Sequence, residues 1–263
     1  MVSGTVLLTG SAGRIGTYLR HGLPGLGWKL RGYDIATAPD DPDQVVADIR
    51  DPDRLAPVMD GVGAVVHLAG IPTEDRFDRI MSANIDGTYQ VFEAARRAGV
   101  RRVVYASSNH AVGFLPRQPL APVDGPPRPD TYYGLSKVFG EALARLYVDR
   151  HGMSVACLRI GSCFDEPSSV RQLSTWLSPG DAVRLVHACL TAPDLDYAVV
   201  YGTSANTRGW WDLDPGRRLG FEPVDNAEQY AAQVLAAVGE LDPNDPDHAY
   251  LGGRFTRADP PVI

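Results

Sequence analysis

The sequence contains few cysteines and no long hydrophobic run. Three cysteines occur among 263 residues, and neither their odd number nor their spacing fits a disulfide framework or a metal site, so they are expected to be free thiols in a reducing compartment. No apolar stretch is long enough to span a bilayer, and residues 1–10 lack the basic and apolar regions of a signal peptide. These absences predict a cytoplasmic protein without a metal centre or a membrane partner.

Basic residues are also outnumbered by acidic ones. The chain has 25 Lys and Arg residues against 32 Asp and Glu residues, and its formal net charge is -7. A negative surface repels nucleic acid and anionic membranes, so neither is expected to be a partner. An anionic small molecule can still bind, but it requires a local pocket of positive charge.

Short apolar runs rich in strand-forming residues alternate with helical patterns as far as Ile160. Strands are predicted over 5–9, 29–34, 44–49, 64–68, 102–106 and 154–160. Helices are predicted after the first strand, after Asp51, over 77–98 and over 132–150. This order predicts an α/β fold, a Rossmann-like doubly wound parallel sheet.

The pattern is looser after Ile160, where a helix over 181–191, a strand over 197–201 and a helix over 226–238 are predicted. The remaining length allows only a small addition to the main sheet. We therefore predict a single domain, residues 1–263, with a small C-terminal substrate lobe formed mainly by residues 161–263.

A glycine-rich turn follows the first strand and opens a helix. Gly10, Gly13 and Gly16 are three residues apart. Glycines let the backbone approach a pyrophosphate, and the N–H groups of a helix N-terminus attract its charge. Such glycines can also be purely structural, but their position after a strand favours dinucleotide binding. Arg14 and Ile15 lie within the same turn and are predicted to contact the cofactor.

Asp34 ends the second strand, where a carboxylate can accept both ribose hydroxyls and would repel a 2′-phosphate. NAD is therefore favoured over NADP, and the alternative is a solvated loop carboxylate. Asp48 and Ile49 end the third predicted strand and are expected to flank the adenine. Further cofactor contacts are predicted at the ends of the fourth and sixth strands, where ligands bind in such sheets, at Leu68, Ala69, Gly70 and Ile160.

Tyr133 and Lys137 are four residues apart at the start of a predicted helix, so they share a face. A tyrosine has a pKa of about 10 and needs a nearby positive charge to act as a base near neutrality. This spacing more often reflects a packed Tyr beside a solvated Lys. Here, however, the pair follows an N-terminal half with a dinucleotide-binding pattern, which favours a catalytic role. Ser108 follows the fifth strand, where its hydroxyl either holds a reacting oxygen or caps a loop.

These motifs resemble the extended short-chain dehydrogenase/reductase family, also called the NAD-dependent epimerase/dehydratase family. More narrowly, the chain resembles the bacterial uronate dehydrogenases over nearly its whole length. The stretches that carry this narrower resemblance include Ala106–His110, Arg159–Cys163 and Gly209–Asp212.

The resemblance implies oxidation of C1 of a cyclic hexuronate, D-galacturonate or D-glucuronate, to an aldaro-lactone with NAD as acceptor. It implies that Tyr133 is the general base, that Lys137 binds the nicotinamide ribose and tunes Tyr133, and that Ser108 positions the C1 oxygen. It also implies that Arg171 clamps the substrate carboxylate with a bidentate guanidinium. The other residues implied for the sugar site are Asn109, His110, Ser162 and Phe255.

The sequence departs from the family pattern before Glu74. Pro72 and Thr73 stand where family members often carry Ser and Val, so one contact to the sugar is either missing or supplied by Thr73. Trp210 and Trp211 suggest a sugar platform, but packing within the small lobe is the favoured interpretation.

Two other functions fit the same motifs. A nucleotide-sugar epimerase or dehydratase needs room for a nucleotide diphosphate, which the short C-terminal part does not favour. A non-catalytic NAD-sensing protein is the alternative outside enzymes, and the intact Ser108, Tyr133 and Lys137 weigh against it. The exposed faces of helices 77–98 and 132–150 predict a homo-oligomer.

Overall fold

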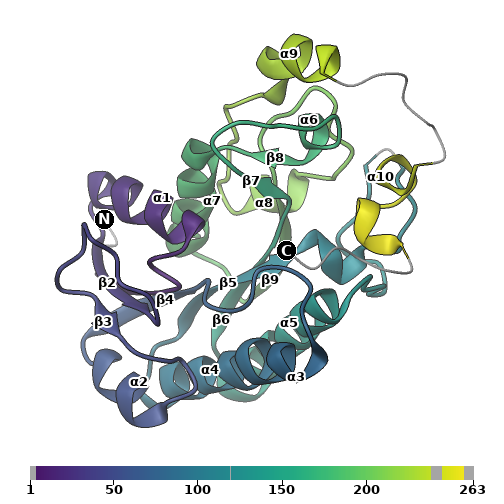
Figure 1. The fold of residues 1–263 in the computed structure, drawn as a ribbon. Coiled ribbons are helices and arrows are strands. Elements are labelled where there is room, and N and C mark those ends of the chain that lie inside the picture. The colour runs from purple at the N-terminus through teal and green to yellow at the C-terminus, as the bar shows by residue number, and fades with distance from the viewer. Residues whose placement is uncertain (1–3, 119, 238–244, 258–263) are drawn as a thin grey trace.

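The computed structural model describes residues 4–118, 120–237 and 245–257, and a seven-stranded sheet runs through it (Figure 1). The strands are β1 (Thr5–Thr9), β2 (Lys29–Asp34), β3 (Val45–Val46), β4 (Val62–His67), β5 (Arg102–Ser108), β6 (Ser154–Ile160) and β9 (Tyr197–Gly202). All neighbouring pairs are parallel, in the order β3-β2-β1-β4-β5-β6-β9. This confirms the predicted doubly wound, Rossmann-like fold, in which ligands bind where the order reverses, between β1 and β4.

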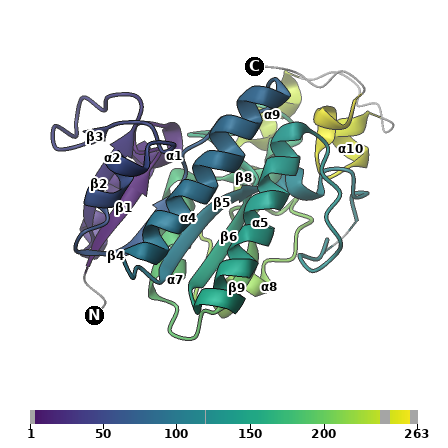
Figure 2. The same ribbon diagram turned by 90° about the horizontal axis from the view of Figure 1, so that it is seen from below.

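Helices cover both faces of this sheet. α1 (Arg14–Gly22) and α7 (Pro179–Thr191) lie on one face, and α2 (Pro52–Val58), α4 (Gly87–Arg97) and α5 (Tyr132–His151) lie on the other (Figures 1 and 2). The central strands are therefore buried on both sides, which explains why they consist of continuous apolar runs rather than alternating ones.

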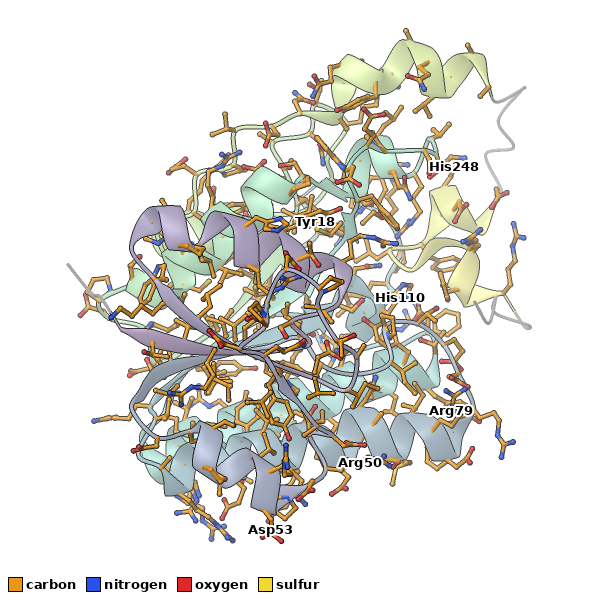
Figure 3. All side chains as sticks on the ribbon, turned by 60° about the vertical axis from the view of Figure 1, so that its left-hand side comes forward. Tyr18, Arg50, Asp53, Arg79, His110 and His248 are labelled. Atoms are coloured by element: carbon orange, nitrogen blue, oxygen red, sulfur yellow. The ribbon has the colours of Figure 1, made fainter. Side chains whose placement is uncertain are left out.

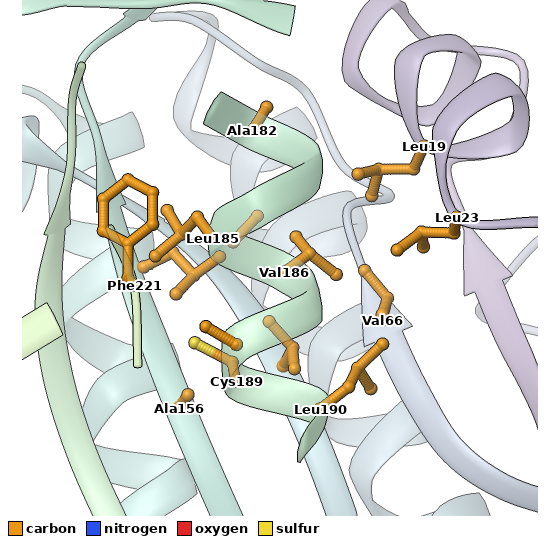
Figure 4. Close-up of a cluster of buried hydrophobic side chains, with 14 of the residues drawn as sticks. Leu19, Leu23, Val66, Ala156, Ala182, Leu185, Val186, Cys189, Leu190 and Phe221 are labelled. Atoms are coloured by element: carbon orange, nitrogen blue, oxygen red, sulfur yellow. The ribbon is translucent and has the colours of Figure 1, made fainter. Parts of the chain in front are cut away.

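The core between α1, α7 and the sheet consists mainly of aliphatic side chains (Figure 4). Leu185, Val186 and Leu190 of α7 are buried at helical spacing. Leu19 of α1 and Leu23 just after it are fully buried in the same core. Burying a Leu or Val side chain contributes roughly 1.5–3 kcal/mol, so this layer holds α1, which follows the glycine-rich turn, firmly against the sheet.

α5 owes its start and its end to two local signals. The Thr131 hydroxyl accepts a hydrogen bond from Gly134 N at 2.9 Å, which satisfies one free N–H group of the first turn. Gly152 at the other end adopts a left-handed conformation, with φ of 61°, that most residues avoid. The helix therefore begins just before Tyr133 and places Tyr133 and Lys137 on one side of its first turns.

The predicted third strand, 44–49, is reduced to Val45–Val46. β3 is an edge strand that pairs only with Tyr33 and Asp34 at the end of β2. In the described part of the chain no strand lies on its other side, so little holds the following residues in the sheet. The chain turns away and brings Asp48 to the cleft described below.

The single long helix predicted from Phe77 is wrong in its middle. α3 (Phe77–Ile80) passes into a π-helical turn over Met81–Asp86 before α4 begins. The wider turn holds the buried Asn84, whose amide contacts the backbone of Ile71 and the hydroxyl of Ser136. π-helical turns are frequent at functional sites, and this one reaches the loop after β4 and the helix that carries Tyr133.

Most of the chain after Ile160 forms the small lobe. Its elements are β7 (Ser162–Cys163), α6 (Gln172–Thr175), β8 (Trp176–Leu177), α8 (Asp214–Arg218), α9 (Ala231–Ala236) and α10 (Pro246–Ala249). Short 3₁₀ turns lie at Pro24–Leu26, Asn109–Val112, Ala227–Tyr230 and Gly253–Thr256. α7 packs on the main sheet, and β9 is one of its edge strands. The predicted helix 226–238 begins as a 3₁₀ turn and continues as α9, and Val238 lies outside the described residues.

Trp210 and Trp211 are buried within this lobe. The Trp211 ring stacks on Tyr201 with centroids 5.0 Å apart, and both tryptophans belong to a cluster that includes Val112 and Leu251. The packing interpretation of the two tryptophans is confirmed.

The structure bears on the cysteines, on membrane-spanning helices and on metal-ligand clusters. Cys157, Cys163 and Cys189 are free and buried. In residues 4–118, 120–237 and 245–257, no helix combines the length and the apolar character needed to cross a membrane. The same ranges contain no group of three or more His, Cys, Asp or Glu side chains that could hold a metal ion.

His67 ends β4 inside the core, between two threonine hydroxyls. Its Nδ1 lies 2.7 Å from Thr9 Oγ1, and its Nε2 lies 3.1 Å from Thr88 Oγ1. Burial lowers the pKa of His67 to about 3, and the charge of Lys137 acts in the same direction. The folded protein therefore keeps this imidazole neutral at pH values where the unfolded chain protonates it.

We expect His67 to make the fold sensitive to acid. Between about pH 6.5 and 3 the unfolded state binds the extra proton, so stability falls with decreasing pH by up to about 1.4 kcal/mol per pH unit. His67→Gln removes the titration, and urea unfolding from about pH 6.5 to 4 should show a shallower loss than in wild type. The exposed His151→Gln serves as the control and should follow wild type. Equal slopes for His67→Gln and wild type would contradict this account.

Candidate active site

A cleft of about 1090 Å³ opens along the carboxyl ends of the strands. Every residue predicted to contact the cofactor lines it: Gly10, Gly13, Arg14, Ile15, Gly16, Asp34, Asp48, Ile49, Leu68, Ala69, Gly70, Tyr133, Lys137 and Ile160. Arg50 and Arg79, which also line the cleft, are labelled in Figure 3. The strand ends thus gather one continuous lining from segments that are far apart in the sequence.

The backbone of the glycine-rich turn is packed so closely that residues larger than glycine do not fit at two positions. Gly10 has a φ of 74°, and a Cβ at this position would lie 2.7 Å from Ala69 N. A Cβ at Gly16 would lie 2.2 Å from the carbonyl oxygen of Gly10. The first turn of α1 has no acidic residue, and its N-cap, Gly13, has no side chain, so the free N–H groups can receive an anion. These features fit the pyrophosphate of a dinucleotide.

Asp34 lies beside this turn at the end of β2. Its carboxylate accepts hydrogen bonds from the backbone N–H groups of Ala12 and Ala36, both at 3.0 Å. These bonds fix the carboxylate at the wall of the cleft. A carboxylate in this position suits the ribose hydroxyls of NAD and opposes the 2′-phosphate of NADP.

Tyr133 and Lys137 face the cleft from α5, and both are buried. Lys137 Nζ donates a hydrogen bond to the carbonyl of Ala106 at 2.8 Å and lies 5.3 Å from the centroid of the Tyr133 ring. Tyrosine, ammonium and the end of β5 are therefore held together, as the four-residue spacing predicts.

Burial shifts both titrations in this pair. It raises the pKa of Tyr133 to about 12; hydrogen bonding with Ser108 lowers this pKa, and the charge of Asp130 raises it. Burial also lowers the pKa of Lys137 to about 8. Without a further positive charge in the cleft, the tyrosine is held as a neutral phenol.

Ser108 stands at the end of β5, behind the cleft wall. Its neighbour Ser107 lines the cleft, whereas the Ser108 hydroxyl accepts a hydrogen bond from His110 N at 3.2 Å, as a loop cap does, and is close enough to Tyr133 to lower its pKa. The structure thus brings Ser108 to the predicted base. Its role toward a substrate oxygen stays a prediction.

Asn109 and His110 lie under the C-terminal segment 245–257. Asn109 Nδ2 donates to the carbonyl of Leu251 at 2.9 Å. The His110 ring lies 4.6 Å from the Phe255 ring and 5.8 Å from the Tyr133 ring, measured between centroids. Figure 3 shows His110 and the yellow segment that carries His248 on the same side of the molecule. The structure thus brings His110 and Phe255 together beside Tyr133.

Arg171 does not line the large cleft. Its guanidinium donates to the carbonyls of Asp247, Tyr250 and Leu251. Burial lowers the pKa of Arg171 to about 10, and Asp247 opposes this shift. Arg171 lines a second hollow of about 270 Å³, together with Arg117, Val170, Ser174, Arg208 and His248. A cation is thus present near the C-terminal segment, with neutral carbonyls as its hydrogen-bond acceptors.

Thr73 and Ser162 also lie outside the lining of the large cleft, although their neighbours Pro72 and Gly161 belong to it. Within the described residues, Thr73 Oγ1 is buried without a hydrogen-bond partner. Ser162 Oγ lies 2.9 Å from Thr175 Oγ1. The Thr73 hydroxyl is therefore unpaired within the described residues, whereas the Ser162 hydroxyl is already engaged.

Two buried polar residues of the site were not predicted. The Glu74 carboxylate accepts a hydrogen bond from Tyr133 N at 2.9 Å, although the two residues are 59 positions apart. Asn84 joins the loop at Ile71 to Ser136 on α5. Asn84 is a polar residue on the apolar face of its helix, and this break in the apolar pattern could have marked it in the sequence. No local pattern marks Glu74.

Fold and cleft together define a dinucleotide-binding α/β protein with a Tyr–Lys pair inside its cleft. Residues 6–167 match the model of the NAD dependent epimerase/dehydratase family, and the chain belongs to that family.

Several relatives are similar over almost the full length. The chain is 42% identical to the uronate dehydrogenase of Pseudomonas syringae pv. tomato over 97% of this chain and 94% of the relative. A crystal structure of a mutant uronate dehydrogenase from Agrobacterium tumefaciens, complexed with NAD, is 41% identical, with a TM-score of 0.91 over 97% of both chains. The NAD-dependent glucose-6-phosphate dehydrogenase of Haloferax volcanii is 39% identical over 86% of this chain and 95% of the relative. The narrower resemblance to uronate dehydrogenases is thus confirmed, and it includes the C-terminal lobe.

Gly10→Ala tests the glycine-rich turn. The left-handed backbone costs a non-glycine residue about 1–2 kcal/mol, and the new Cβ would push against Ala69 N. The turn should therefore shift, and NAD affinity measured by fluorescence titration should fall by about tenfold or more. Gly25→Ala is the matched control, because a Cβ there meets nothing within 4 Å. Unchanged affinity in Gly10→Ala would show that the cofactor does not approach this turn.

Proposed function

We propose that the protein oxidises the C1 hydroxyl of a cyclic hexuronate, D-galacturonate or D-glucuronate, to the aldaro-lactone with NAD. The observation that carries this proposal is the buried Tyr133–Lys137 pair inside a cleft that fits a dinucleotide. The similarity to uronate dehydrogenases over 97% of the chain supports the substrate class.

In this reaction Tyr133 takes the proton from the C1 hydroxyl, and Ser108 holds the C1 oxygen by a hydrogen bond. Lys137 keeps its ammonium close to the phenolate and binds the nicotinamide ribose. Bound NAD supplies the hydride acceptor and a positive ring that favours the phenolate. The Ala106 carbonyl fixes Lys137, so the charge that lowers the pKa of the tyrosine stays in place.

NAD is proposed to bind along the cleft. Its contacts are the glycine-rich turn, Asp34, Asp48, Ile49 and the ends of β4 and β6, which all line the cleft. The sugar is proposed to lie toward the C-terminal segment, with Ser108, Tyr133, Thr73, Asn109, His110, Ser162, Arg171 and Phe255 around it. Thr73 is supported by its unpartnered buried hydroxyl.

Arg171 is proposed to bind the carboxylate of the sugar acid. Its guanidinium is bonded to neutral carbonyls, and no carboxylate forms an ion pair with it among the described residues. A substrate carboxylate would replace some of these acceptors with stronger charge-assisted bonds. The protein has a net charge of -7, so a local cation of this kind is what an anionic substrate needs.

The protein is also proposed to act as a single domain that forms a homo-oligomer. Phe77, Met81, Tyr132 and Leu135 are each more than 40% exposed, on the α3–η2 segment (η2 is the π-helical turn) and α5. The rings of Phe77 and Tyr132 lie 5.1 Å apart, so these side chains form one patch. Clustered apolar exposure of this kind is typical of an interface.

Tyr133→Phe should keep the ring and remove the proton acceptor. We expect NAD to bind as in wild type and turnover of galacturonate to fall by about two or more orders of magnitude, the scale of general-base loss. The neighbouring Tyr132→Phe is the control, since Tyr132 is half exposed and should stay active. NADH formation at neutral pH measures both variants. Near-normal turnover of Tyr133→Phe would remove Tyr133 from its role.

Arg171→Ala should weaken turnover of the acid far more than that of the neutral sugar. A lost charged hydrogen bond typically costs about 1.5–3 kcal/mol, so kcat/KM for galacturonate should fall by roughly tenfold to a hundredfold. Arg171→Lys keeps the positive charge but loses the bidentate geometry of the guanidinium, so it should recover only part of the loss. Galactose, which has no carboxylate, should show little change.

The exposed Arg217→Ala serves as the control for a general loss of positive charge. Equal losses of kcat/KM for galacturonate and galactose would mean that Arg171 supports the C-terminal segment and does not bind the substrate carboxylate.

A further inference from the structure

His110 and Asp130 form a buried pair beside Tyr133. His110 Nδ1 lies 2.7 Å from Asp130 Oδ2, and the Asp130 side chain is fully shielded from solvent. A carboxylate can only accept a hydrogen bond, so the proton between the two groups belongs to Nδ1. In the neutral imidazole the other nitrogen, Nε2, is then an acceptor, and it has no partner in the described part of the chain.

Space for the Asp130 carboxylate is provided by glycines from separate segments. A Cβ at Gly113 would lie 1.9 Å from Asp130 Oδ2, and a Cβ at Gly252 would lie 1.8 Å from the same atom. The φ angles of these glycines, -57° and -83°, are ones that any residue adopts. The absence of a side chain at Gly113 is therefore required by the carboxylate, whereas a Cβ at Gly252 would also lie 2.9 Å from the backbone Cα of Gly113.

The second oxygen of the same carboxylate is tied to the start of α5. Thr131 Oγ1 donates to Asp130 Oδ1 at 3.0 Å and accepts from Gly134 N at 2.9 Å. The residues that orient His110 thus also cap the helix that carries Tyr133. His110 is fixed relative to the base by a chain of hydrogen bonds rather than by packing alone.

We propose that Asp130 is a positioning residue that holds His110 in the Nδ1–H tautomer, so that Nε2 accepts a hydrogen bond from a sugar hydroxyl of the substrate. The proposal rests on the proposed function for the identity of the ligand. The hydroxyl is one that does not react, because the C1 oxygen is assigned to Tyr133 and Ser108. The contact is therefore made equally in the bound substrate and in the transition state, and its loss raises KM without lowering kcat.

The tautomer is tested on the NAD-bound protein with four variants, and His110→Gln is used in addition for the assignment and the kinetics. Asp130→Asn keeps the size of the side chain. Its amide oxygen is expected to keep the hydrogen bond from Thr131 Oγ1, which turns the NH2 group toward His110 Nδ1 and favours the opposite tautomer. Gly113→Ala keeps the carboxylate and displaces it, because the three nearest atoms to a Cβ there all belong to the Asp130 side chain. Asp124→Asn and Gly125→Ala are matched controls from the same loop, because Asp124 is exposed and a Cβ at Gly125 meets nothing within 4 Å.

The tautomer is measured by ¹⁵N NMR, with the His110 signals assigned by their loss in His110→Gln. We expect a protonated Nδ1 in wild type and both controls, and a change of tautomer or a mixture in Asp130→Asn and Gly113→Ala. A wild-type protein with the proton on Nε2, or an Asp130→Asn variant with an unchanged tautomer, would overturn the proposal. This arm needs no sugar, so it stands even if uronates are not substrates.

The kinetic arm combines Asp130→Asn with His110→Gln. Each single variant should raise KM for the uronate by about tenfold, the effect of one lost hydrogen bond, with kcat nearly unchanged. The double variant should be no worse than His110→Gln, because Asp130 acts through His110. Multiplied losses in the double variant, or a loss in kcat, would show that Asp130 supports the fold or the chemistry independently. Wild-type protein inactive on every uronate would count against the proposed function instead.

Discussion

The hydrogen bond from Lys137 to the carbonyl of Ala106 joins the two parts of the site. It links the helix that presents Tyr133 to the strand that ends at Ser108. Without this acceptor the ammonium would be buried and unpaired, which is costly in a medium of low polarity. Because the carbonyl belongs to the central sheet, the ammonium of Lys137 has a fixed place relative to the cofactor cleft.

The sheet topology makes this arrangement possible. Parallel strands bring their carboxyl ends to one edge, and the reversal between β1 and β4 opens the crevice there. Gly10 then approaches Ala69 so closely that no side chain fits at this point of the turn. Beyond the cleft, the C-terminal segment supplies the carbonyls that satisfy Arg171 and Asn109. The cleft residues therefore rest on the sheet edge, whereas Arg171 and Asn109 are held by a short C-terminal segment.

The parts of this site that depend on local spacing were predictable. The glycines of the first turn, Asp34 after β2, and the pair Tyr133–Lys137 follow from patterns within a few residues and from the α/β order. Contacts between distant segments were not predictable in this way: Glu74 meets Tyr133 across 59 positions and Asn109 meets Leu251 across 142. The π-helical turn at Asn84 also has no simple periodic signature, because its spacing differs from that of the flanking helix.

The central claim is that a sugar acid is oxidised at C1 with NAD. The most direct measurement is NADH formation by the wild-type protein with D-galacturonate and D-glucuronate, compared with galactose, glucose, glucose 6-phosphate and a UDP-sugar, the last followed also for epimerisation. The account predicts NADH with at least one uronate at a kcat/KM well above those of the other compounds. A preference for glucose 6-phosphate or a neutral sugar, or conversion of the UDP-sugar without net NADH, would contradict it.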